Sequence, residues 1–341
     1  MHRATFAKIL TYSLVLSVVT GGSQAAGARP LSAAEILQQH GFAAYQWHGV
    51  SHAGTSTTQQ RLPFLQSQGF KAVYLDLSDY LGVADQRDSA AKQARLGQLK
   101  VSLKRLVAGA SSRGLAVQAV SGGPTWTNAS RRYLGAKLVQ LVAAHNTTAT
   151  ASERLKGVQL DIEPYRDPNF FKDTNAALVD YLKTLQSIVQ EYRRQRTQPA
   201  NSSLQLGFAI PFWFDGEGRA PGPVAFNGTT KPATYHLIDM LKDLPGAYIV
   251  VMSYRNFASG VDGSIIHAQN EFQYANSVGA KCGLVVGQEF GKVEPAKVTF
   301  NGLSRRAFKK AAEEIAGAFG RFPQFRGLSV NDMDAYTTAK D

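Results

Sequence analysis

The chain has 341 residues, of which 44% are hydrophobic, and a formal net charge of +12. This composition is sufficient for a large core, and no low-complexity tract or internal repeat interrupts it. The single cysteine, Cys282, excludes an internal disulfide. The positive charge favours an anionic partner such as an acidic polysaccharide, a cell wall or an anionic membrane surface. It also suits nucleic acid, but no nucleic-acid motif accompanies it, so we expect no nucleic-acid partner.

The amino terminus resembles an export signal rather than part of a fold. Arg3 and Lys8 precede an apolar run over residues 9–19, and the small-residue segment Ser23-Gln24-Ala25 follows. This pattern predicts a signal peptide over residues 1–26 and a single domain over residues 27–341. We therefore expect a bacterial protein that is secreted or periplasmic and is not stably inserted in a membrane after cleavage. A retained membrane anchor is the alternative.

Predicted strands and helices alternate along the remaining chain. The expected strands cover residues 41–48, 69–76, 115–120, 157–163, 204–210, 247–254, 281–286 and 326–330. The expected helices cover residues 32–39, 55–68, 88–112, 129–144, 175–196, 235–244, 264–277 and 304–319. Strict alternation over eight units predicts a closed (β/α)₈ (TIM) barrel of class α/β. A doubly wound open sheet is the alternative, but no glycine-rich phosphate turn follows the first strand.

The fourth predicted strand carries acids on one face. Apolar residues alternate with Gln159, Asp161 and Glu163, so the polar side chains share a face. Pro164 cannot donate to a sheet ladder and ends the strand there. Burying unpaired carboxylates is costly, which indicates that these groups are used or paired. A structural ion pair with Arg or Lys is the alternative to a functional role.

Other polar and aromatic residues also follow predicted strands. In a barrel these positions converge on one mouth. All three tryptophans of the chain belong to this set, and flat aromatic faces beside carboxylates suit stacking on sugar rings. The expected substrate-binding residues are Trp47, His48, Asp76, Trp126, Tyr165, Trp213, Arg255, Asn331 and Asp332.

Two strands resemble those of a known family. Residues 157–163 are similar to the fourth-strand Asp-x-Asp-x-Glu signature of the chitinase-type glycoside hydrolases of family 18. The resemblance implies that Glu163 is the general acid and that Asp161 orients the acetamido group of the substrate. The segment Met252-Ser253-Tyr254 resembles the family's sixth-strand motif, which implies that Tyr254 holds the acetamido oxygen. The chain departs from the family at Gln159, where another Asp is usual, and at Asn331, where a Trp is usual.

A second glycosidase arrangement fits the same residues. Glu163-Pro164 and Glu289 resemble the acid and the nucleophile of retaining barrel glycosidases that use two glutamates. Either mechanism predicts a monomeric hydrolase that acts on a polysaccharide or oligosaccharide, possibly an acidic one, without a cofactor or metal. A metal cage and a Ser-His-Asp hydrolase are less favoured, since histidine pairs and a Gly-x-Ser-x-Gly elbow are missing. The alternative class is a non-catalytic carbohydrate-binding barrel, favoured by the two departures from family 18.

Overall fold

The computed structural model describes residues 29–53, 56–216 and 221–341. The predicted signal peptide therefore lies outside the described residues and stays a prediction. Residues Ser32–Asp341 form one compact unit. Within the described ranges, no helix has the length and apolar character needed to cross a membrane.

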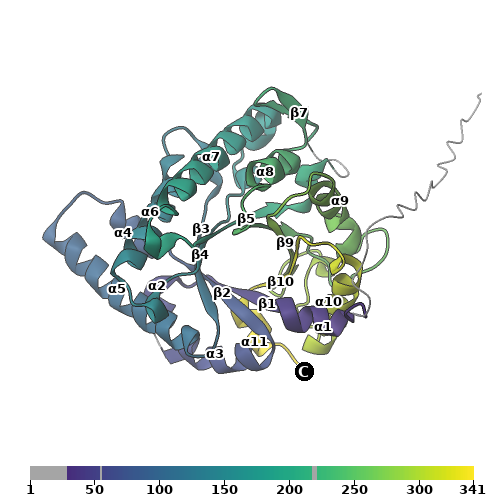
Figure 1. Ribbon diagram of the computed structural model, residues 1–341, viewed down its shortest axis with the longest axis horizontal. Coiled ribbons are helices and arrows are strands. Elements are labelled where there is room, and N and C mark those ends of the chain that lie inside the picture. Colours follow the sequence, from purple (N-terminus) through teal and green to yellow (C-terminus); the bar gives the residue numbers. More distant parts are fainter. Residues whose placement is uncertain (1–28, 54–55, 217–220) are drawn as a thin grey trace, which may run out of the picture. The chain divides into compact units, whose positions relative to one another are not determined.

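Eight parallel strands close into a barrel in the order β1-β10-β9-β8-β5-β4-β3-β2 (Figure 1). The first strand pairs with both β2 and β10, so the sheet has no open edge. This closure confirms the predicted TIM barrel and excludes the open sheet. The barrel strands are β1 (Phe42–Gln46), β2 (Phe70–Asp76), β3 (Ala116–Ser121), β4 (Gly157–Leu160), β5 (Gln205–Pro211), β8 (Ala247–Met252), β9 (Gly283–Glu289) and β10 (Phe325–Asn331).

Helices surround the barrel, because each parallel strand needs a crossover to reach its neighbour (Figure 1). The helices that match the predicted ones are α1 (Ala33–His40), α3 (Ser56–Ser67), α5 (Ala90–Ser111), α6 (Tyr133–Thr148), α7 (Thr174–Gln195), α8 (Ala233–Leu241), α9 (Ser264–Ser277) and α10 (Arg305–Phe319). The elements not predicted are α2 (Gly49–Ala53), α4 (Ser78–Ala84), α11 (Met333–Thr338) and the hairpin β6 (Val224–Phe226) with β7 (Thr229–Lys231). All of these additions follow barrel strands, on the side where a barrel places its chemistry.

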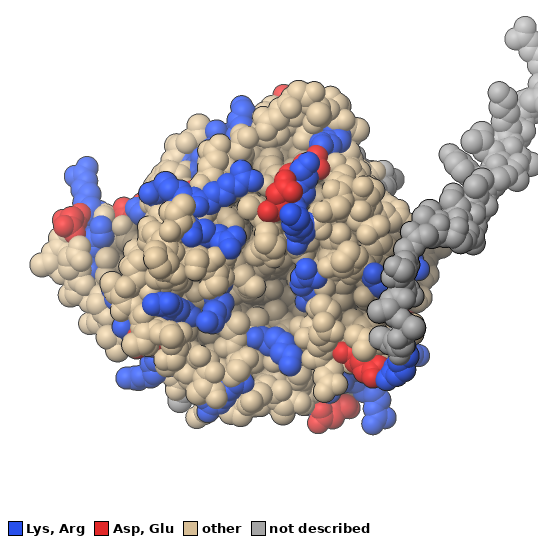
Figure 2. Space-filling view, viewed as in Figure 1, with Lys and Arg blue, Asp and Glu red and all other residues tan. Residues whose placement is uncertain are grey.

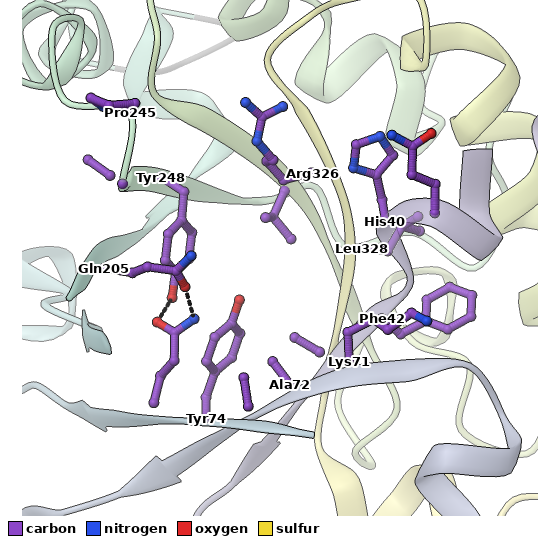
Figure 3. A pocket seen from close by; sticks show the side chains of 17 residues that line it. His40, Phe42, Lys71, Ala72, Tyr74, Gln205, Pro245, Tyr248, Arg326 and Leu328 are labelled. Carbon is purple, nitrogen blue, oxygen red and sulfur yellow. Dashed lines mark hydrogen bonds between the residues drawn. The ribbon is translucent and has the colours of Figure 1, made fainter. Parts of the chain in front are cut away.

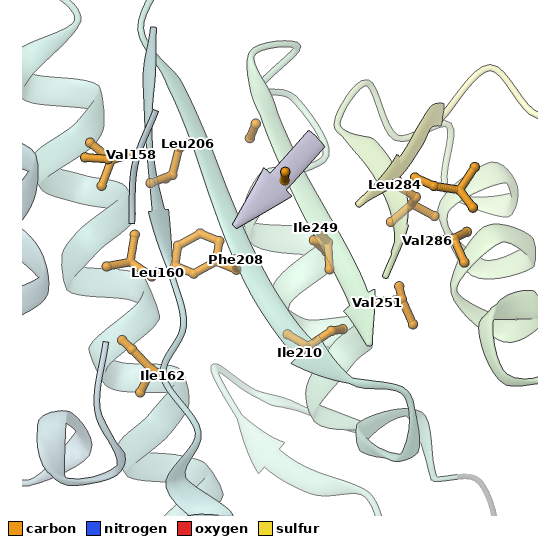
Figure 4. Packing of buried hydrophobic residues seen from close by; sticks show 14 of the residues in the cluster. Val158, Leu160, Ile162, Leu206, Phe208, Ile210, Ile249, Val251, Leu284 and Val286 are labelled. Atoms are coloured by element: carbon orange, nitrogen blue, oxygen red, sulfur yellow. The ribbon is translucent and has the colours of Figure 1, made fainter. Parts of the chain in front are cut away.

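Apolar side chains on the outer face of the barrel pack against the helices. Figure 4 shows this layer on β4, β5, β8 and β9, where residues such as Leu160, Phe208 and Val286 are fully buried. Burial of a side chain of this size contributes about 1.5–3 kcal/mol. Alternate residues therefore point inward, and this alternation turns Gln159 into the barrel, where its amide donates to the hydroxyl of Tyr45.

The fourth strand is shorter than predicted. It ends at Leu160, and a short 3₁₀ turn, Pro164–Arg166, follows the acidic residues. Asp161 keeps one ladder contact, since its amide donates to the carbonyl of Ser121 on β3. The ring of Pro164 provides no amide for a further ladder bond, so the chain turns away from the sheet. The two acids consequently lie just beyond the strand, at the carboxyl-end mouth.

Candidate active site

One pocket of about 890 Å³ lies at the carboxyl ends of the barrel strands. Its lining comes from residues that end or directly follow β1, β2, β3, β4, β8, β9 and β10, segments far apart in the sequence. The structure brings these predicted site residues together in the pocket: Trp47, Asp76, Asp161, Glu163, Tyr165, Tyr254, Glu289 and Asn331.

Glu163 is positioned by two donors from the turn that follows it. The side chain of Glu163 is 17% exposed. The hydroxyl of Tyr165 donates to Oε1, and Arg166 Nη1 donates to Oε2 at 3.0 Å. Arg166 is itself 67% exposed at the pocket rim. The predicted acid therefore borders the pocket with one donor on each oxygen.

Asp161 has a different environment. Its Oδ1 is buried, and none of the described residues donates a hydrogen bond to it. Burial raises the pKa of Asp161 to about 7, the negative charge of Glu163 adds to this effect, and Arg166 opposes it. The raised pKa favours the protonated form of Asp161, and its buried Oδ1 has no donor among the described residues.

The close approach of β3 and β4 fixes the backbone at Asp161. A Cβ atom added at Gly122 would lie 1.9 Å from the carbonyl oxygen of Asp161. Such a distance is far inside van der Waals contact, so a residue without a side chain is required there. Gly122 thus allows Asp161 to sit at the pocket wall.

Glu289 is held by a chain of hydrogen bonds across β9, β10 and β1. Asn331 pairs with Glu289 in the strand register, and Asn331 Nδ2 donates to Glu289 Oε2 at 2.6 Å. Trp47 Nε1 donates to Asn331 Oδ1 at 2.6 Å, and the amide of Gly291 donates to Glu289 Oε1. Burial nevertheless raises the pKa of Glu289 to about 7, with the two donors acting in the opposite direction.

Tyr254 lies among the acids. Burial raises its pKa well above the usual value, and the nearby charges of Glu289, Asp161 and Glu163 raise it further. Its hydroxyl therefore stays protonated and can donate to a ligand. Arg255 Nη1 donates to the carbonyl oxygen of Tyr254 at 2.7 Å, which anchors this part of the β8–α9 loop.

Asp76 contributes a further carboxyl group from the end of β2. Its Oδ1 accepts from the amide of Ser78 at 2.8 Å and from the Ser78 hydroxyl at 2.6 Å. No hydrogen bond to Oδ2 is found in the described part of the chain, and the residue lines the pocket. Burial raises the pKa of Asp76, and the Ser78 donors act against that shift.

The pocket lining does not include five predicted residues. Arg255 is buried in an ion pair with Asp262. His48 is exposed and contacts Asp334, while Asp332 accepts from the amide of Ala335 and caps α11. Each of the three is engaged by another part of the protein.

The two remaining predicted tryptophans lie beside the pocket. Trp213 packs against Tyr165 with ring centroids 5.1 Å apart. Trp126 is 7% exposed and lines a neighbouring pocket of about 360 Å³ that shares Ser78 and Gly122 with the central one. Trp47 is the one tryptophan of the described residues in the lining of the central pocket, and its ring stacks on that of Tyr45 with ring centroids 5.2 Å apart.

Sequence reasoning missed several lining residues, namely Tyr45, Ser78, Arg166, Met252 and Glu294. Arg166 carried a usable signal, because a cation three residues after an acid can reach it across one turn. Glu294 carried none, since it belongs to the β9–α10 connection and no periodic pattern places that segment over the pocket. Among the described residues, no group of three or more His, Cys, Asp or Glu side chains could hold a metal ion.

Another pocket, of about 320 Å³, opens at the opposite end of the barrel, at the amino ends of the strands (Figure 3). Tyr248 donates to Gln118 there, and Gln118 donates to Gln205, so these polar groups satisfy one another. The described lining contains His40, Lys71 and Arg326 but no Asp or Glu. This pocket therefore has no carboxyl group to act as a proton donor, and the candidate active site is the carboxyl-end pocket.

Comparisons with known proteins agree with the fold. The chain matches no protein-family profile and no curated protein sequence. A family 18 chitinase from Pseudoalteromonas aurantia is similar in structure, with a TM-score of 0.51 and 13% identity over 85% of this chain and 93% of that one. A broad-specificity family 5 endoglucanase from Clostridium longisporum has a TM-score of 0.50 and 14% identity over 88% of this chain and 87% of that one.

The tri-modular endo-β-1,4-glucanase B from Bacillus halodurans has a TM-score of 0.55 and 12% identity. The match covers 92% of this chain but 59% of that longer protein. At such identities the likeness extends to the fold. The chain therefore has the barrel architecture of these glycosidases, at a sequence distance expected of a diverged relative.

Proposed function

We propose that this protein is a glycoside hydrolase in which Glu163 is the general acid and base. The observation that carries the proposal is the carboxyl-end pocket itself. It combines Asp161, Glu163 and Glu289 with the half-buried rings of Trp47 and Tyr165. Hydrolysis of a glycosidic bond needs two carboxyl groups around the bond, and sugar rings bind well on aromatic faces.

The contacts of Glu163 suit a group that releases a proton. In the first step the Glu163 carboxyl donates its proton to the glycosidic oxygen, and the bond from that oxygen to the sugar carbon breaks. Tyr165 and Arg166 donate to the carboxylate that is left behind. The carboxylate then accepts a proton from the water that completes hydrolysis, which restores the starting state.

Two routes are open on the sugar carbon side of the bond. Glu289 can attack the carbon directly, because Asn331 and Gly291 hold its carboxylate in a fixed orientation. Alternatively, Asp161 and Tyr254 can orient an acetamido group that attacks from within the substrate. Substitutions separate the two routes. Direct attack predicts that Glu289→Gln reduces turnover as strongly as Glu163→Gln, whereas acetamido participation predicts the larger loss for Asp161→Asn.

Kinetics of Glu163→Gln test the proposal. We expect turnover on the preferred oligosaccharide to fall by about 100- to 10,000-fold, because the amide cannot donate a carboxyl proton, while ligand binding persists. Glu313→Gln on the exposed side of α10 is the matched control and should keep normal turnover. Unchanged turnover in Glu163→Gln would refute the assigned role.

A non-catalytic carbohydrate-binding barrel is the second candidate. It is favoured by Gln159, a neutral amide that donates to Tyr45 at the position where family 18 carries a further Asp. A binding protein would retain equal glycan affinity in the wild type and in Glu163→Gln, with no turnover in either form. Measured hydrolysis by the wild type would exclude it.

The site of action is also part of the proposal. The amino-terminal pattern of residues 1–26 supports export, and a polysaccharide substrate is consistent with action outside the cytoplasm. Fractionation of a bacterial host that expresses the full chain tests this point. The mature protein is expected in the periplasm or medium, starting close to residue 27.

A further inference from the structure

The central pocket has a charge opposite to that of the whole chain. Its described lining contains five carboxyl side chains and one guanidinium, but no lysine or histidine. The carboxyl groups belong to Asp76, Asp161, Glu163, Glu289 and Glu294, and the guanidinium to Arg166. The chain as a whole carries a formal net charge of +12.

The positive charge of the protein lies elsewhere. On the face shown in Figure 2, Lys and Arg clearly outnumber Asp and Glu. The pocket at the amino end is lined by His40, Lys71 and Arg326 and by no acid among the described residues. Net charge therefore gives no guide to what the central pocket binds, and an acidic glycan would meet repulsion there.

Two of the five pocket carboxyl groups, those of Asp76 and Glu294, belong to neither of the proposed routes of bond cleavage. Glycoside hydrolysis uses a pair of carboxyl groups, which Glu163 and either Glu289 or Asp161 provide. Asp76 lies on β2, and Glu294 lies in the β9–α10 connection, so they reach the pocket from separate elements. Asp76 is half-buried in the pocket lining, and Glu294 is an exposed lining residue.

Asp76 and Glu294 have no cationic partner among the residues that the structure describes. Arg166, the sole guanidinium of the described lining, already donates to Glu163. No ion pair to Asp76 or Glu294 occurs among the described residues. Unneutralised carboxylates in a concave, partly water-excluded site attract a cation more strongly than isolated surface acids, because the local dielectric is lower.

We propose that the central pocket selects a cationic amino-sugar glycan, in which free ammonium groups on sugars flanking the scissile bond contact Asp76 and Glu294. This inference rests on the proposed glycosidase function and adds its substrate class. Each ammonium donates to one of the two carboxylates, and the sugar ring stacks on Trp47. A neutral glycan can offer hydroxyl donors to the two carboxylates but no opposite charge, and hydrogen bonds in which donor and acceptor are both charged are the stronger ones.

The test uses pairs of oligosaccharides whose amines are either free or N-acetylated. Tetramers of glucosamine and of galactosamine, in α-1,4 and β-1,4 linkage, are each compared with their N-acetylated form, and tetragalacturonate serves as the anionic member. Affinity and kcat/KM are measured with the full mature chain at low salt and at about 0.5 M salt, where exposed charges are screened. Asp76→Asn, Glu294→Gln and the control Glu313→Gln are measured alongside the wild type.

We expect at least one free-amine tetramer to bind about 10-fold or more tightly than its N-acetylated partner, a difference equivalent to about 1.4 kcal/mol. High salt, Asp76→Asn and Glu294→Gln should each reduce that ratio severalfold, and Glu313→Gln should not. Because Glu294 is exposed, its substitution tests the proposal even where Asp76→Asn lowers stability. Tighter binding of the N-acetylated or anionic members overturns this inference and leaves the glycosidase proposal intact. Binding and hydrolysis of none of the tetramers overturns both.

Discussion

Asp161 and Glu289 are two pocket acids whose surroundings strongly oppose ionisation. Burial raises the pKa of each to about 7. For Asp161 the charge of Glu163 adds to the effect, whereas for Glu289 the donors Asn331 and Gly291 reduce it. In the folded protein both shifts favour the protonated form of these two carboxyl groups.

The raised pKa of Asp161 predicts a stability that depends on pH. An unfolded Asp loses its proton near pH 4, whereas the folded residue keeps it until about pH 7, so folded Asp161 is penalised as the pH rises through this window. Asp161→Asn should therefore become more stable relative to the wild type between pH 4 and pH 8, by on the order of 2 kcal/mol. Chemical denaturation at several pH values measures the difference.

Asp243→Asn is the control for this experiment, since Asp243 is an exposed surface acid. Its stability relative to the wild type should not change over the same pH range. A constant difference between Asp161→Asn and the wild type would mean that Asp161 titrates normally in the folded protein.

Asn331 is a positioning residue for Glu289. Its amide favours the ionised form of Glu289, so Asn331→Leu should raise the pKa of Glu289 above about 7. Loss of a hydrogen bond to a charged group costs about 1.5–3 kcal/mol, which corresponds to a loss in kcat/KM of about 10- to 100-fold. The acid limb of the pH–rate profile should also move to higher pH.

A purely structural role of Asn331 would lower activity without moving that limb. Asn276→Leu, at an exposed position of α9, provides the comparison and should leave the profile unchanged.

At the scale of elements, the ends of β3 and β4 determine where Asp161 lies. Gly122 permits their backbones to approach, and Pro164, four residues after the end of β4, has no amide for a further ladder bond. The chain then forms the short turn that carries Tyr165 and Arg166 to Glu163. The position of Glu163 thus depends on Gly122 and Pro164 as much as on the direct contacts with Tyr165 and Arg166.

Gly122→Ala tests this dependence. The added methyl group would overlap the carbonyl oxygen of Asp161, and overpacking of this kind costs typically about 1–3 kcal/mol. We expect a lower melting temperature together with a loss of turnover. Gly109→Ala is the matched control, because a Cβ atom there meets nothing within 4 Å and Gly109 lies inside α5.

The control should be neutral or more stable by up to about 1 kcal/mol, since Ala favours a helix over Gly. Equal melting temperatures for Gly122→Ala and the wild type would show that the β3–β4 contact is not tight.

The periodicity of apolar residues predicted the barrel strands and helices well, because these patterns arise within short segments of the chain. The alternation in residues 157–163 placed Gln159, Asp161 and Glu163 on the inner side, and the Ser32–Glu35 capping box placed the start of α1. The additions α4 and α11 were missed, because they are short segments within connections and have no long apolar stripe. The sequence did not predict the surroundings of Trp126 and Arg255. Trp126 lines its pocket with residues distant in the chain, and Arg255 pairs with Asp262 across a loop that has no periodic pattern.

At the scale of the molecule, the barrel separates two differently charged ends. The carboxyl-end pocket contains acids and aromatic rings, and the amino-end pocket contains cations and amides. The closed sheet holds both in place, because β1 pairs with β2 and β10 and leaves no free edge. The net charge of the whole chain averages over these regions, so it does not predict the charge of either pocket.

The structure of Glu163→Gln with a bound oligosaccharide tests the central claim most directly. We predict that the ligand occupies the carboxyl-end pocket, stacks on Trp47, and places a glycosidic oxygen about 2.6–3.2 Å from the side chain at position 163. A ligand in the amino-end pocket of Figure 3, or one whose glycosidic oxygens all lie out of reach of position 163, would contradict the account.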